Sequence, residues 1–586
     1  MLVNKKIKQP LPTGIDSFKK IRTDGYYYID KTMLIADFLQ LKNNVTLITR
    51  PRRFGKTLNM TMLREFFDIE QKNAELFAGL AIMKTEYVSD LNTKPVIYLT
   101  FKSSSGTAID DLKDSLAHQM MKEYIRFGKV FKNLVDKDDI DYFTFYQTYD
   151  ALKKVLTPRP NDCKDESQVD TGLFKKSLTT LLQTVTHFYN KPTLLLIDEY
   201  DQPLLNAHES GFREQFSREI YADFLGDALK GNEALGQSML TGIQRVAKES
   251  IFSKLNNPVV YTVVDEIYAP YFGLTERETK KALEDNGLVL TDGIKRYYDG
   301  YTFGGIDVYN PWSILNYITK KRLESYWLNT STNVLIRELI TNQKHRFYED
   351  FETLITKGRV TVTANMEASF MELGSVATLW GLLINAGYLT INGRKGTKRY
   401  EVRIPNNEVK EEFSAIVELY TYQEDEGDLQ AMFDALMDSE MEEFLKIYRS
   451  LIVRYVSFYD TAIHDGAEPE NSYHMLFLGM CMSMLGMYKP RSNKEDGDGR
   501  SDIIMVSLEP NLRPHIIVEF KRLKEAGNLK KVAGVALEQI FTNRYYGDLR
   551  GNTLCIGIAH FGKKAELVYR EIDVDEYGAL VLQGMS

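Results

Sequence analysis

Short apolar segments alternate with longer amphipathic stretches through the first half of this chain. Three of the short segments, residues 45–49, 95–101 and 193–197, are rich in β-branched and aliphatic side chains, and helical patterns separate them. Parallel strands need long crossover connections, which are usually helices. The order of segments therefore predicts βαβ units around a mostly parallel sheet, which is an α/β fold.

Composition places the chain among globular proteins and limits its partners. Hydrophobic residues make up 44% and charged residues 26%, and the formal net charge is −8. These values exclude a largely disordered or collagen-like chain, and 586 residues are enough for several domains. Because the whole chain is mildly acidic, any nucleic-acid site must be a local basic patch.

The cysteines and the apolar runs of the sequence indicate the cellular location of the protein. The three cysteines are widely spaced and form no CxxC pattern, and the first residues, MLVNKKIKQPLPTG, contain no apolar segment. This predicts a cytoplasmic protein with no secretory signal. The most apolar run, residues 475–487, is shorter than the ~18 residues of a membrane span, so no membrane partner is expected. We expect a buried helix there, with an adaptable methionine-rich binding face as the alternative.

A strand followed by the tripeptide GKT marks a candidate phosphate-binding loop. Residues 45–57 read VTLITRPRRFGKT, so a strand ends near residue 49 and a helix begins at the GKT. In P-loops, backbone N–H groups and the helix N-terminus hold phosphate oxygens. Lys56 would reach the β- and γ-phosphates of ATP, and the Thr57 hydroxyl would bind Mg²⁺. The predicted nucleotide-binding residues of this loop are Arg53, Phe54, Gly55, Lys56 and Thr57. Arg50 stands where the usual pattern has its first glycine, so the turn must be built differently.

A second apolar strand ends in adjacent carboxylates. Residues 192–200 read PTLLLIDEY, and we expect Asp198 to bind Mg²⁺ and Glu199 to polarise the attacking water. Adjacent acidic residues alone are also typical of a helix N-terminus, but together with the upstream GKT they favour an ATPase. Thr241 and Arg245 follow another apolar stretch and are candidate γ-phosphate sensors, although an ordinary surface arginine fits equally well.

The character of the chain changes after residue 270. Thr275 and Glu278 are spaced as the capping box of a short helix. Residues 377–391 predict an apolar helix that runs through Gly387 into a strand, as in a winged-helix-like lid or another small helix–strand unit. Residues 424–451 are acidic and helical, and we expect a solvated connector rather than an acidic interaction tail.

Two strands near the C-terminus carry a candidate metal site. Residues 497–522 read GDGRSDIIMVSLEPNLRPHIIVEFKR, which predicts a hairpin with Asp502 at its opening. Glu519 and Lys521 are two residues apart on the second strand, so both side chains leave the same face. Two carboxylates suit Mg²⁺ or Mn²⁺, and a neighbouring lysine can stabilise the charge on a phosphodiester. Alternating charges at a strand end are more often a solvated rim, but the buried apolar run before Glu519 favours a catalytic site.

Residues flanking this hairpin could assist it. Glu470 could add a third carboxylate ahead of a helix that carries His474, and Gln539 lies on the helix that follows Lys521. Phosphate binding requires local positive charge. The basic residues of this segment are Arg500, Lys521, Arg522, Lys524, Lys530, Lys531 and Arg544.

Taken together, the motifs resemble a family of bacterial proteins with an AAA-ATPase-like N-terminal region and a C-terminal PD-(D/E)xK nuclease domain. The resemblance covers nearly the whole chain. It is carried by residues 11–32 (LPTGIDSFKKIRTDGYYYIDKT), TRPRRFGKT, LLIDEYDQPL, SIFSKLNN, YDGYTFG, NPWSILNYI, YWLNTSTN, LINAGYLT, ENSYHMLFLGM, GRSDIIM and IIVEFKR. Arg50 matches the family pattern, Lys56, Thr57, Asp198 and Glu199 match its ATPase positions, and Asp502, Glu519 and Lys521 match its nuclease core.

The resemblance implies three parts: an ATPase-like P-loop domain at residues 1–270, a helical or winged-helix-like lid at 271–415, and a helical connector with a nuclease-like α/β domain at 416–586. The expected protein binds and hydrolyses ATP and cleaves nucleic acid, DNA rather than RNA, with a homo-oligomer as one possible assembly. ATP binding would move the lid and license the nuclease. The alternatives are an ATP-controlled switch that binds nucleic acid or protein without cleavage, and an ATPase that remodels protein partners.

Overall fold

A computed structural model describes the chain apart from a set of segments. Those segments are residues 1–8, 133–138, 158–170, 246–257, 328–349, 352, 355–356, 367–374, 411–425, 461–472, 474–476, 479, 485, 493–494, 497–498, 524–526, 562–563, 576 and 581–586. The chain forms two compact units, residues 1–336 with 363–400 (unit 1) and residues 337–362 with 401–586 (unit 2). The chain passes between the two units at three points: one lies in β9 (Val360–Thr363), one in β11 (Arg399–Arg403), and one, between residues 336 and 337, outside the described residues. Within the described part, no helix has the length and apolarity needed to cross a membrane.

Unit 1 is built around a sheet whose strands run in the order β2-β3-β4-β1-β5, with every neighbouring pair parallel. The strands are β1 (Val45–Thr49), β2 (Val96–Thr100), β3 (Thr193–Asp198), β4 (Leu235–Gly242) and β5 (Val259–Tyr261). The α/β prediction is therefore confirmed, and the three predicted strands are present to within a residue or two. All side chains of β1 and β3 are buried, as expected for strands covered on both faces.

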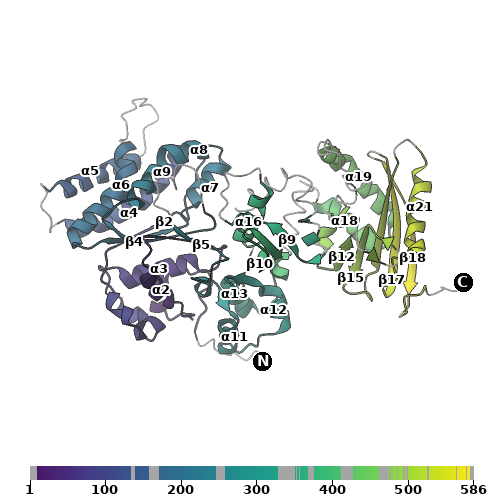
Figure 1. Cartoon of the computed structure of the whole chain (residues 1–586), viewed down its shortest axis with the longest axis horizontal. Coiled ribbons are helices and arrows are strands. Elements are labelled where there is room, and N and C mark those ends of the chain that lie inside the picture. Colours follow the sequence, from purple (N-terminus) through teal and green to yellow (C-terminus); the bar gives the residue numbers. More distant parts are fainter. Residues whose placement is uncertain are drawn as a thin grey trace. The chain divides into compact units, whose positions relative to one another are not determined.

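Helices cover both faces of this sheet. Figure 1 shows α4, α5, α6 and α9 on one face and α2 and α3 on the other. These helices are α2 (Met33–Leu41), α3 (Lys56–Phe67), α4 (Ile109–Phe131), α5 (Ile140–Val155), α6 (Thr171–Tyr189) and α9 (Ala222–Leu229). Short helices α7 (Gln202–Glu209) and α8 (Arg213–Phe216) follow β3. Loops therefore follow the carboxyl ends of the strands, and in folds of this kind ligands bind at those carboxyl ends.

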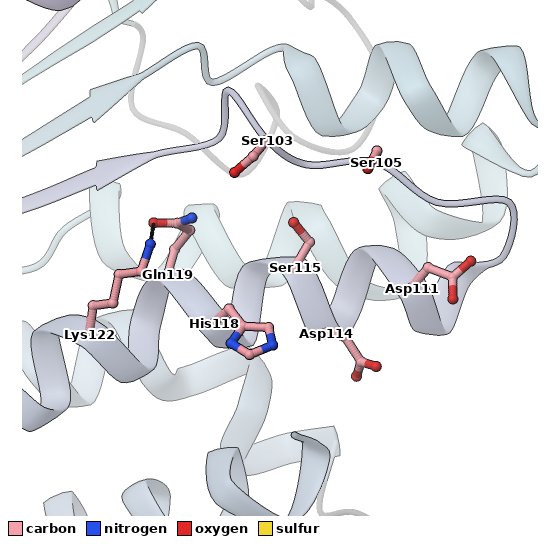
Figure 2. A pocket seen from close by; sticks show the side chains of 8 residues that line it. All are labelled: Ser103, Ser105, Asp111, Asp114, Ser115, His118, Gln119 and Lys122. Atoms are coloured by element: carbon pink, nitrogen blue, oxygen red, sulfur yellow. Dashed lines mark hydrogen bonds between the residues drawn. The ribbon is translucent and has the colours of Figure 1, made fainter. Parts of the chain in front are cut away.

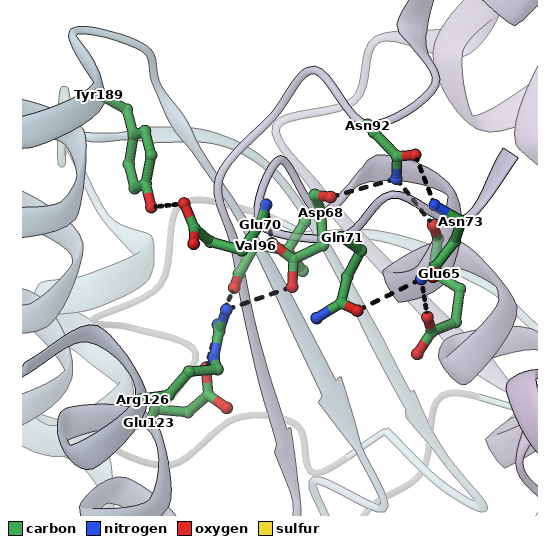
Figure 3. Close-up of polar contacts among 10 residues, drawn as sticks. All are labelled: Glu65, Asp68, Glu70, Gln71, Asn73, Asn92, Val96, Glu123, Arg126 and Tyr189. Atoms are coloured by element: carbon green, nitrogen blue, oxygen red, sulfur yellow. Dashed lines mark hydrogen bonds and ion pairs between the residues drawn. The ribbon is translucent and has the colours of Figure 1, made fainter. Parts of the chain in front are cut away.

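A buried polar network fixes the far end of α3 (Figure 3). The Asn92 amide donates to the main-chain oxygens of Glu65, Phe66 and Asp68, which the helix end leaves without helical partners. Asp68 is fully buried and accepts from the Arg126 guanidinium of α4 at 3.2 Å. Burial raises the pKa of Asp68 to about 6, and the Arg126 charge opposes that rise. Because the amino end of α3 carries the GKT, this network holds the predicted phosphate-binding helix in place.

The segment after residue 270 adds a small sheet and several helices to unit 1. The sheet order is β6-β8-β7, and the capping box is confirmed, since Thr275 N–H donates to Glu278 Oε2 at 2.8 Å. The elements are β6 (Leu274–Thr275), α11 (Glu276–Asp285), α12 (Asp292–Tyr298), β7 (Tyr301–Phe303), β8 (Ile306–Tyr309) and α13 (Pro311–Lys320). The predicted helix-to-strand passage is also confirmed: α16 (Val376–Ala386) ends at Gly387, whose φ is +90°, before β10 (Thr390–Arg394).

Unit 2 contains a mixed five-stranded sheet in the order β12-β15-β16-β17-β18. Its β16 and β17 are parallel, and the other neighbours are antiparallel. The strands are β12 (Tyr488–Ser492), β15 (Ile503–Ser507), β16 (His515–Arg522), β17 (Gly551–Phe561) and β18 (Lys564–Val574), with α21 (Leu529–Thr542) between β16 and β17. The predicted hairpin and the predicted helix after Lys521 are confirmed. Phe477, Leu478, Met480, Cys481 and Met484 are buried, so the described part of the methionine-rich run belongs to the core.

The expectation of a solvated connector at residues 424–451 is wrong. The segment forms α18 (Glu426–Met437) and α19 (Met441–Asp460), whose apolar side chains share one core cluster with the central strands of unit 2. Phe444, Tyr448 and Leu451 are fully buried. Their spacing of three and four residues places them on one apolar face of the helix. The many acidic residues of the opposite face indicated exposure to solvent, so this apolar face was missed in the sequence. The two helices cover one face of the sheet, and α21 covers the other.

Candidate functional sites

The predicted phosphate-binding loop lies between β1 and α3. Gly55 caps α3 in the left-handed conformation, with φ of +84°, and Arg53 is also left-handed, with φ of +68°. Arg50 is not among the left-handed residues, so this loop does not need a glycine at that position. The left-handed residues of this loop, Arg53 and Gly55, lie next to α3 rather than at position 50. The loop therefore turns without a glycine at its usual first position.

Lys56 contacts the loop itself. Its ammonium is buried and donates to the main-chain oxygens of Arg50 at 3.0 Å and Pro51 at 2.9 Å. Burial lowers the pKa of Lys56, while the negative charges of Glu199 and Asp198 oppose that effect. The ammonium is thus held by two neutral oxygens, which an anionic phosphate could outcompete.

Asp198 lies at the carboxyl end of β3 and joins two neighbouring elements. Its Oδ2 accepts from the Thr57 hydroxyl at 2.7 Å, and its Oδ1 accepts from the Thr241 hydroxyl of β4 at 2.6 Å. Burial raises the pKa of this fully buried carboxyl, although the bond from Thr241 opposes the rise. The structure therefore brings together the two predicted Mg²⁺ ligands, Thr57 and Asp198, whose oxygens suit a hard cation, and it places the candidate γ-phosphate sensor Thr241 beside them.

The residue after Asp198 is held in an uncommon backbone conformation. Glu199 has φ of +53°, which is rare for a residue with a side chain and is typical of functional sites. Asp201, two residues further on, was missed by sequence reasoning. Its carboxylate accepts from the main-chain N–H groups of Ile243 at 2.9 Å and Gln244 at 3.0 Å, and burial raises its pKa to about 6. The signal was present as a third acidic residue in the run IDEYD.

The predicted trio of unit 2 meets at one end of the central strands. Asp502 N–H donates to Glu519 Oε2 at 3.2 Å, and Asp502 Oδ2 accepts from the N–H of Phe520 at 2.7 Å. Lys521 Nζ lies 3.4 Å from Glu519 Oε1. Burial and the nearby Asp502 charge raise the pKa of Glu519 to about 8, against the opposing charge of Lys521. A divalent cation fits this donor set, because it would relieve the repulsion between two carboxylates.

A polar chain leads from Glu519 into α21. Gln539 donates through its amide to both Glu519 Oε1 and the Tyr545 hydroxyl, which also accepts from Asn543 at 2.8 Å. The sequence indicated Gln539 as a possible assistant, but Asn543 and Tyr545 were missed because they follow the helix rather than sit on it. Of the predicted cations, Lys521 is 30% exposed, and Arg522, Lys530, Lys531 and Arg544 are exposed. Glu470, His474, Lys524 and the side chain of Arg500 lie outside the described residues.

A pocket of about 510 Å³ lies elsewhere in unit 1, between α4 and the loop that follows β2 (Figure 2). None of the predicted site residues lines it. Its wall is entirely polar or charged and consists of Ser103, Ser105, Asp111, Asp114, Ser115, His118, Gln119 and Lys122. The mixture of acidic and basic groups in its wall favours no ligand class.

The fold and the two carboxylate sites define a two-part α/β protein with an AAA-like core and a PD-(D/E)XK-like mixed sheet. Residues 12–252 match a family model described as a predicted AAA-ATPase, and residues 468–567 match a model of the PD-(D/E)XK nuclease superfamily. An uncharacterized protein encoded in the vnfD 5′ region of Azotobacter chroococcum mcd 1 is 31% identical over 412 residues, 69% of either chain. The chain thus belongs to the family that joins a predicted AAA-ATPase domain to a C-terminal PD-(D/E)XK nuclease domain. The two domain families generally use a nucleotide and a divalent metal ion, and a nuclease domain implies contact with nucleic acid.

Proposed function

We propose that this protein binds and hydrolyses ATP with Mg²⁺ in unit 1 and cleaves DNA phosphodiesters with Mg²⁺ or Mn²⁺ in unit 2. The observation that carries the proposal is the convergence of Asp502, Glu519 and Lys521 at one edge of a buried sheet. A protein that only binds nucleic acid has no need to hold a buried carboxyl, Glu519, against a second carboxyl, Asp502. Functionally we assign residues 1–270 to the ATPase-like core, 271–415 to a lid region, and 416–586 to the nuclease part.

In the ATPase-like core, each side chain has a separate task. Lys56 would leave its two loop oxygens for the β- and γ-phosphates, while Thr57 and Asp198 would hold the Mg²⁺. Glu199 would orient and deprotonate the attacking water, and its left-handed backbone supports a positioned role. The N–H groups of Arg53, Phe54 and Gly55 would bind phosphate oxygens.

In the nuclease part, Asp502 and Glu519 would hold the divalent cation, which supplies Lewis-acid chemistry to the phosphodiester. Lys521 would stabilise negative charge on the scissile phosphate or orient the attacking water. The Gln539 amide, bonded to Glu519 Oε1, would fix the carboxylate in the orientation that binds the cation. The exposed cations around the hairpin would hold the phosphate backbone.

The test is cleavage of a panel of single- and double-stranded DNA and RNA by wild type, Asp502→Ala and Lys521→Ala, with Mg²⁺ or Mn²⁺ and with or without ATP. We expect cleavage of DNA by wild type and its loss in both variants. Wild-type activity in both variants would end the nuclease assignment. Binding without any cleavage by wild type would instead support an ATP-controlled switch.

ATP hydrolysis is tested separately, with Lys56→Ala and Glu199→Gln proteins. We expect Lys56→Ala to lose ATP binding and Glu199→Gln to bind ATP but hydrolyse it poorly, because only the first residue touches the phosphates before reaction. Hydrolysis at the wild-type rate by both variants would remove the ATPase assignment and leave the nuclease assignment untouched.

A further inference from the structure

Arg50, the residue that replaces the usual loop glycine, joins several elements of unit 1. Its main-chain N–H donates to the oxygen of Gly242 at the end of β4, at 3.1 Å, and its own oxygen accepts from Lys56 at 3.0 Å. Its guanidinium Nη1 donates to the oxygens of Thr49 at 2.8 Å and Tyr261 at 3.0 Å. One residue thus connects three strands and the phosphate-binding lysine.

Aromatic side chains from the segment after β5 hold the loop at both of its ends. The Arg50 guanidinium lies over the rings of Phe272 and Phe303, with its carbon 5.5 Å and 5.4 Å from their centroids. Phe54, at the other end of the loop, packs 5.1 Å from Phe303 and 4.9 Å from Tyr301. Phe303 therefore contacts the first and the last side chains of the loop.

The middle of the loop is held in the same way. The Trp327 indole N–H donates to the main-chain oxygen of Arg52 at 3.3 Å. The Arg53 guanidinium carbon lies 4.4 Å from the centroid of the Trp312 ring. All of these residues belong to unit 1, so every one of these contacts with the loop is made within one compact unit. A change in the shape of the loop would therefore disturb its contacts with these aromatic side chains.

Stability alone does not explain Arg50. Its side chain is fully buried, and two of its nitrogens, Nε and Nη2, have no hydrogen-bond partner among the described residues. Burial lowers the pKa of Arg50 to about 10, so the side chain stays charged at neutral pH. Apolar side chains of similar volume usually replace buried charges at no cost or with a gain in stability. A buried cation at this position therefore needs a reason connected with the loop.

We propose that Arg50 is a positioning residue that shapes the phosphate-binding loop and couples its opening to the aromatic segment, here defined as Phe272, Tyr301, Phe303, Trp312 and Trp327. The inference rests on the proposed function of the loop as an ATP site. When ATP draws Lys56 away from the Arg50 oxygen, the two hydrogen bonds from Arg50 Nη1 to Thr49 and Tyr261 keep the strand end in place, and the loop moves against the aromatic rings.

Three substitutions separate the tasks of this side chain. Arg50→Met keeps the volume and removes the charge and both hydrogen bonds, whereas Arg50→Lys keeps the charge but loses the planar guanidinium that lies over Phe272 and Phe303. Arg50→Gly restores the usual P-loop residue, which ought to be harmless if only backbone geometry matters. Arg22→Met is the matched control: Arg22 also donates to two main-chain oxygens, at 2.7 Å and 3.0 Å, and lies 5.9 Å from a tyrosine ring, but does not touch the loop.

The first readout needs no nucleotide: hydrogen exchange of the backbone amides of residues 54–59 in the full-length protein. We expect Arg50→Met and Arg50→Gly to raise that exchange at least about tenfold while the thermal unfolding of the Met variant stays close to wild type. Arg22→Met should leave it unchanged. Wild-type exchange in both Arg50→Met and Arg50→Gly would overturn the positioning role.

The second readout is ATP affinity by calorimetry, together with KM and kcat for hydrolysis. We expect ATP binding at least about tenfold weaker in Arg50→Met and Arg50→Gly, partial recovery in Arg50→Lys, and a larger change in KM than in kcat. If Arg50→Met fails to fold, Arg50→Lys decides alone, since wild-type affinity in it would contradict a role for the guanidinium. If wild type itself binds no ATP, the proposed ATPase function fails. The hydrogen-exchange measurement still tests whether Arg50 positions the loop.

Discussion

Asp198 in unit 1 and Glu519 in unit 2 are both buried carboxyls carried by a strand of a central sheet, but their surroundings differ. Asp198 accepts from two neutral hydroxyls, of Thr57 and Thr241. The charges of Glu199 and Lys56 also act on Asp198, whereas Glu519 is in direct contact with Asp502 and with the ammonium of Lys521. Hydroxyl groups can turn to donate or accept, so the first site tolerates either charge state. The second site is electrostatically unbalanced without a cation, which makes it the more sensitive to metal and pH.

The two sites also differ in how the chain assembles them. The donors around Asp198 come from three elements separated by 141 and 43 residues along the chain. The trio of unit 2 lies within one hairpin, and its further contacts come from the next helix. A site spread over a parallel sheet depends on long-range pairing, whereas a hairpin site is set by local register. Substitutions should therefore act differently in the two units.

The largest effect is expected from Glu519→Gln. Loss of one cation-binding carboxylate should lower DNA cleavage by on the order of 1000-fold, because a bound metal ion contributes several kcal/mol to such reactions. The metal-free protein should not lose stability near pH 8, since the repulsion from Asp502 disappears. Initial cleavage rates and thermal unfolding measure both. Glu509→Gln, an exposed carboxyl of the same hairpin, is the control, and equal cleavage by the two variants would refute the assignment.

Asp198→Asn should act next most strongly, and only on unit 1. The hydroxyls of Thr57 and Thr241 can turn toward an amide, so the fold should persist. ATP hydrolysis should fall at least about 100-fold because the amide binds Mg²⁺ poorly. Steady-state hydrolysis is the measurement, and Asp90→Asn, a part-exposed carboxyl paired with Lys94, is the control. A parallel loss of nuclease activity without ATP would contradict the separation of the two sites.

Metal binding in unit 2 should change by about tenfold per pH unit below the pKa of Glu519. Glu519 must lose a proton to bind a cation, so Mn²⁺ affinity in unit 2 should rise with pH until it levels near the Glu519 pKa of about 8. For the same reason the metal-free protein binds more protons folded than unfolded, and its free energy of unfolding should fall as pH rises from about 4.5 to about 8. Calorimetry and denaturant titration measure the two slopes. Slopes that persist in Glu519→Gln would assign the titration to another group.

The smallest effect tests how α21 is seated over Glu519. A Cβ on Gly557 would lie 2.2 Å from the main-chain oxygen of Ala533, so Gly557→Ala must push the helix away. We expect a loss of about 1 to 3 kcal/mol in stability and weaker cleavage as Gln539 withdraws from Glu519. Gly534→Ala on the same helix has no atom within 4 Å, and should stabilise by up to about 1 kcal/mol. Denaturant titration compares the pair, and equal effects would contradict tight packing at Gly557.

Local signals in the sequence predicted much of the fold and of both sites. The helix after Lys521, the capping box at Thr275 and the strands before the GKT and the DEY run agree with the structure, because apolar periodicity and caps act over a few residues. The hairpin brought Asp502 to Glu519 as expected, since its length fixes the register. Asp201 escaped notice because its partners lie 42 and 43 residues away along the chain, and Tyr545 because it follows α21 on an irregular segment.

Two features came from packing over long distances. The acidic helices α18 and α19 bury an apolar face against the sheet of unit 2, although their charge indicated exposure to solvent. Arg50 is an unexplained departure in the one-dimensional pattern, and its meaning lies in Tyr261, Phe272 and Phe303, more than 200 residues away. Residue types and their spacing were enough to predict the chemistry of each site, because the ability of a carboxylate to bind a cation, or of a lysine to bind a phosphate, belongs to the side chain itself. The environment of each group depends on which distant segments the folded core brings against it, because burial and neighbouring charges set its pKa and its partners.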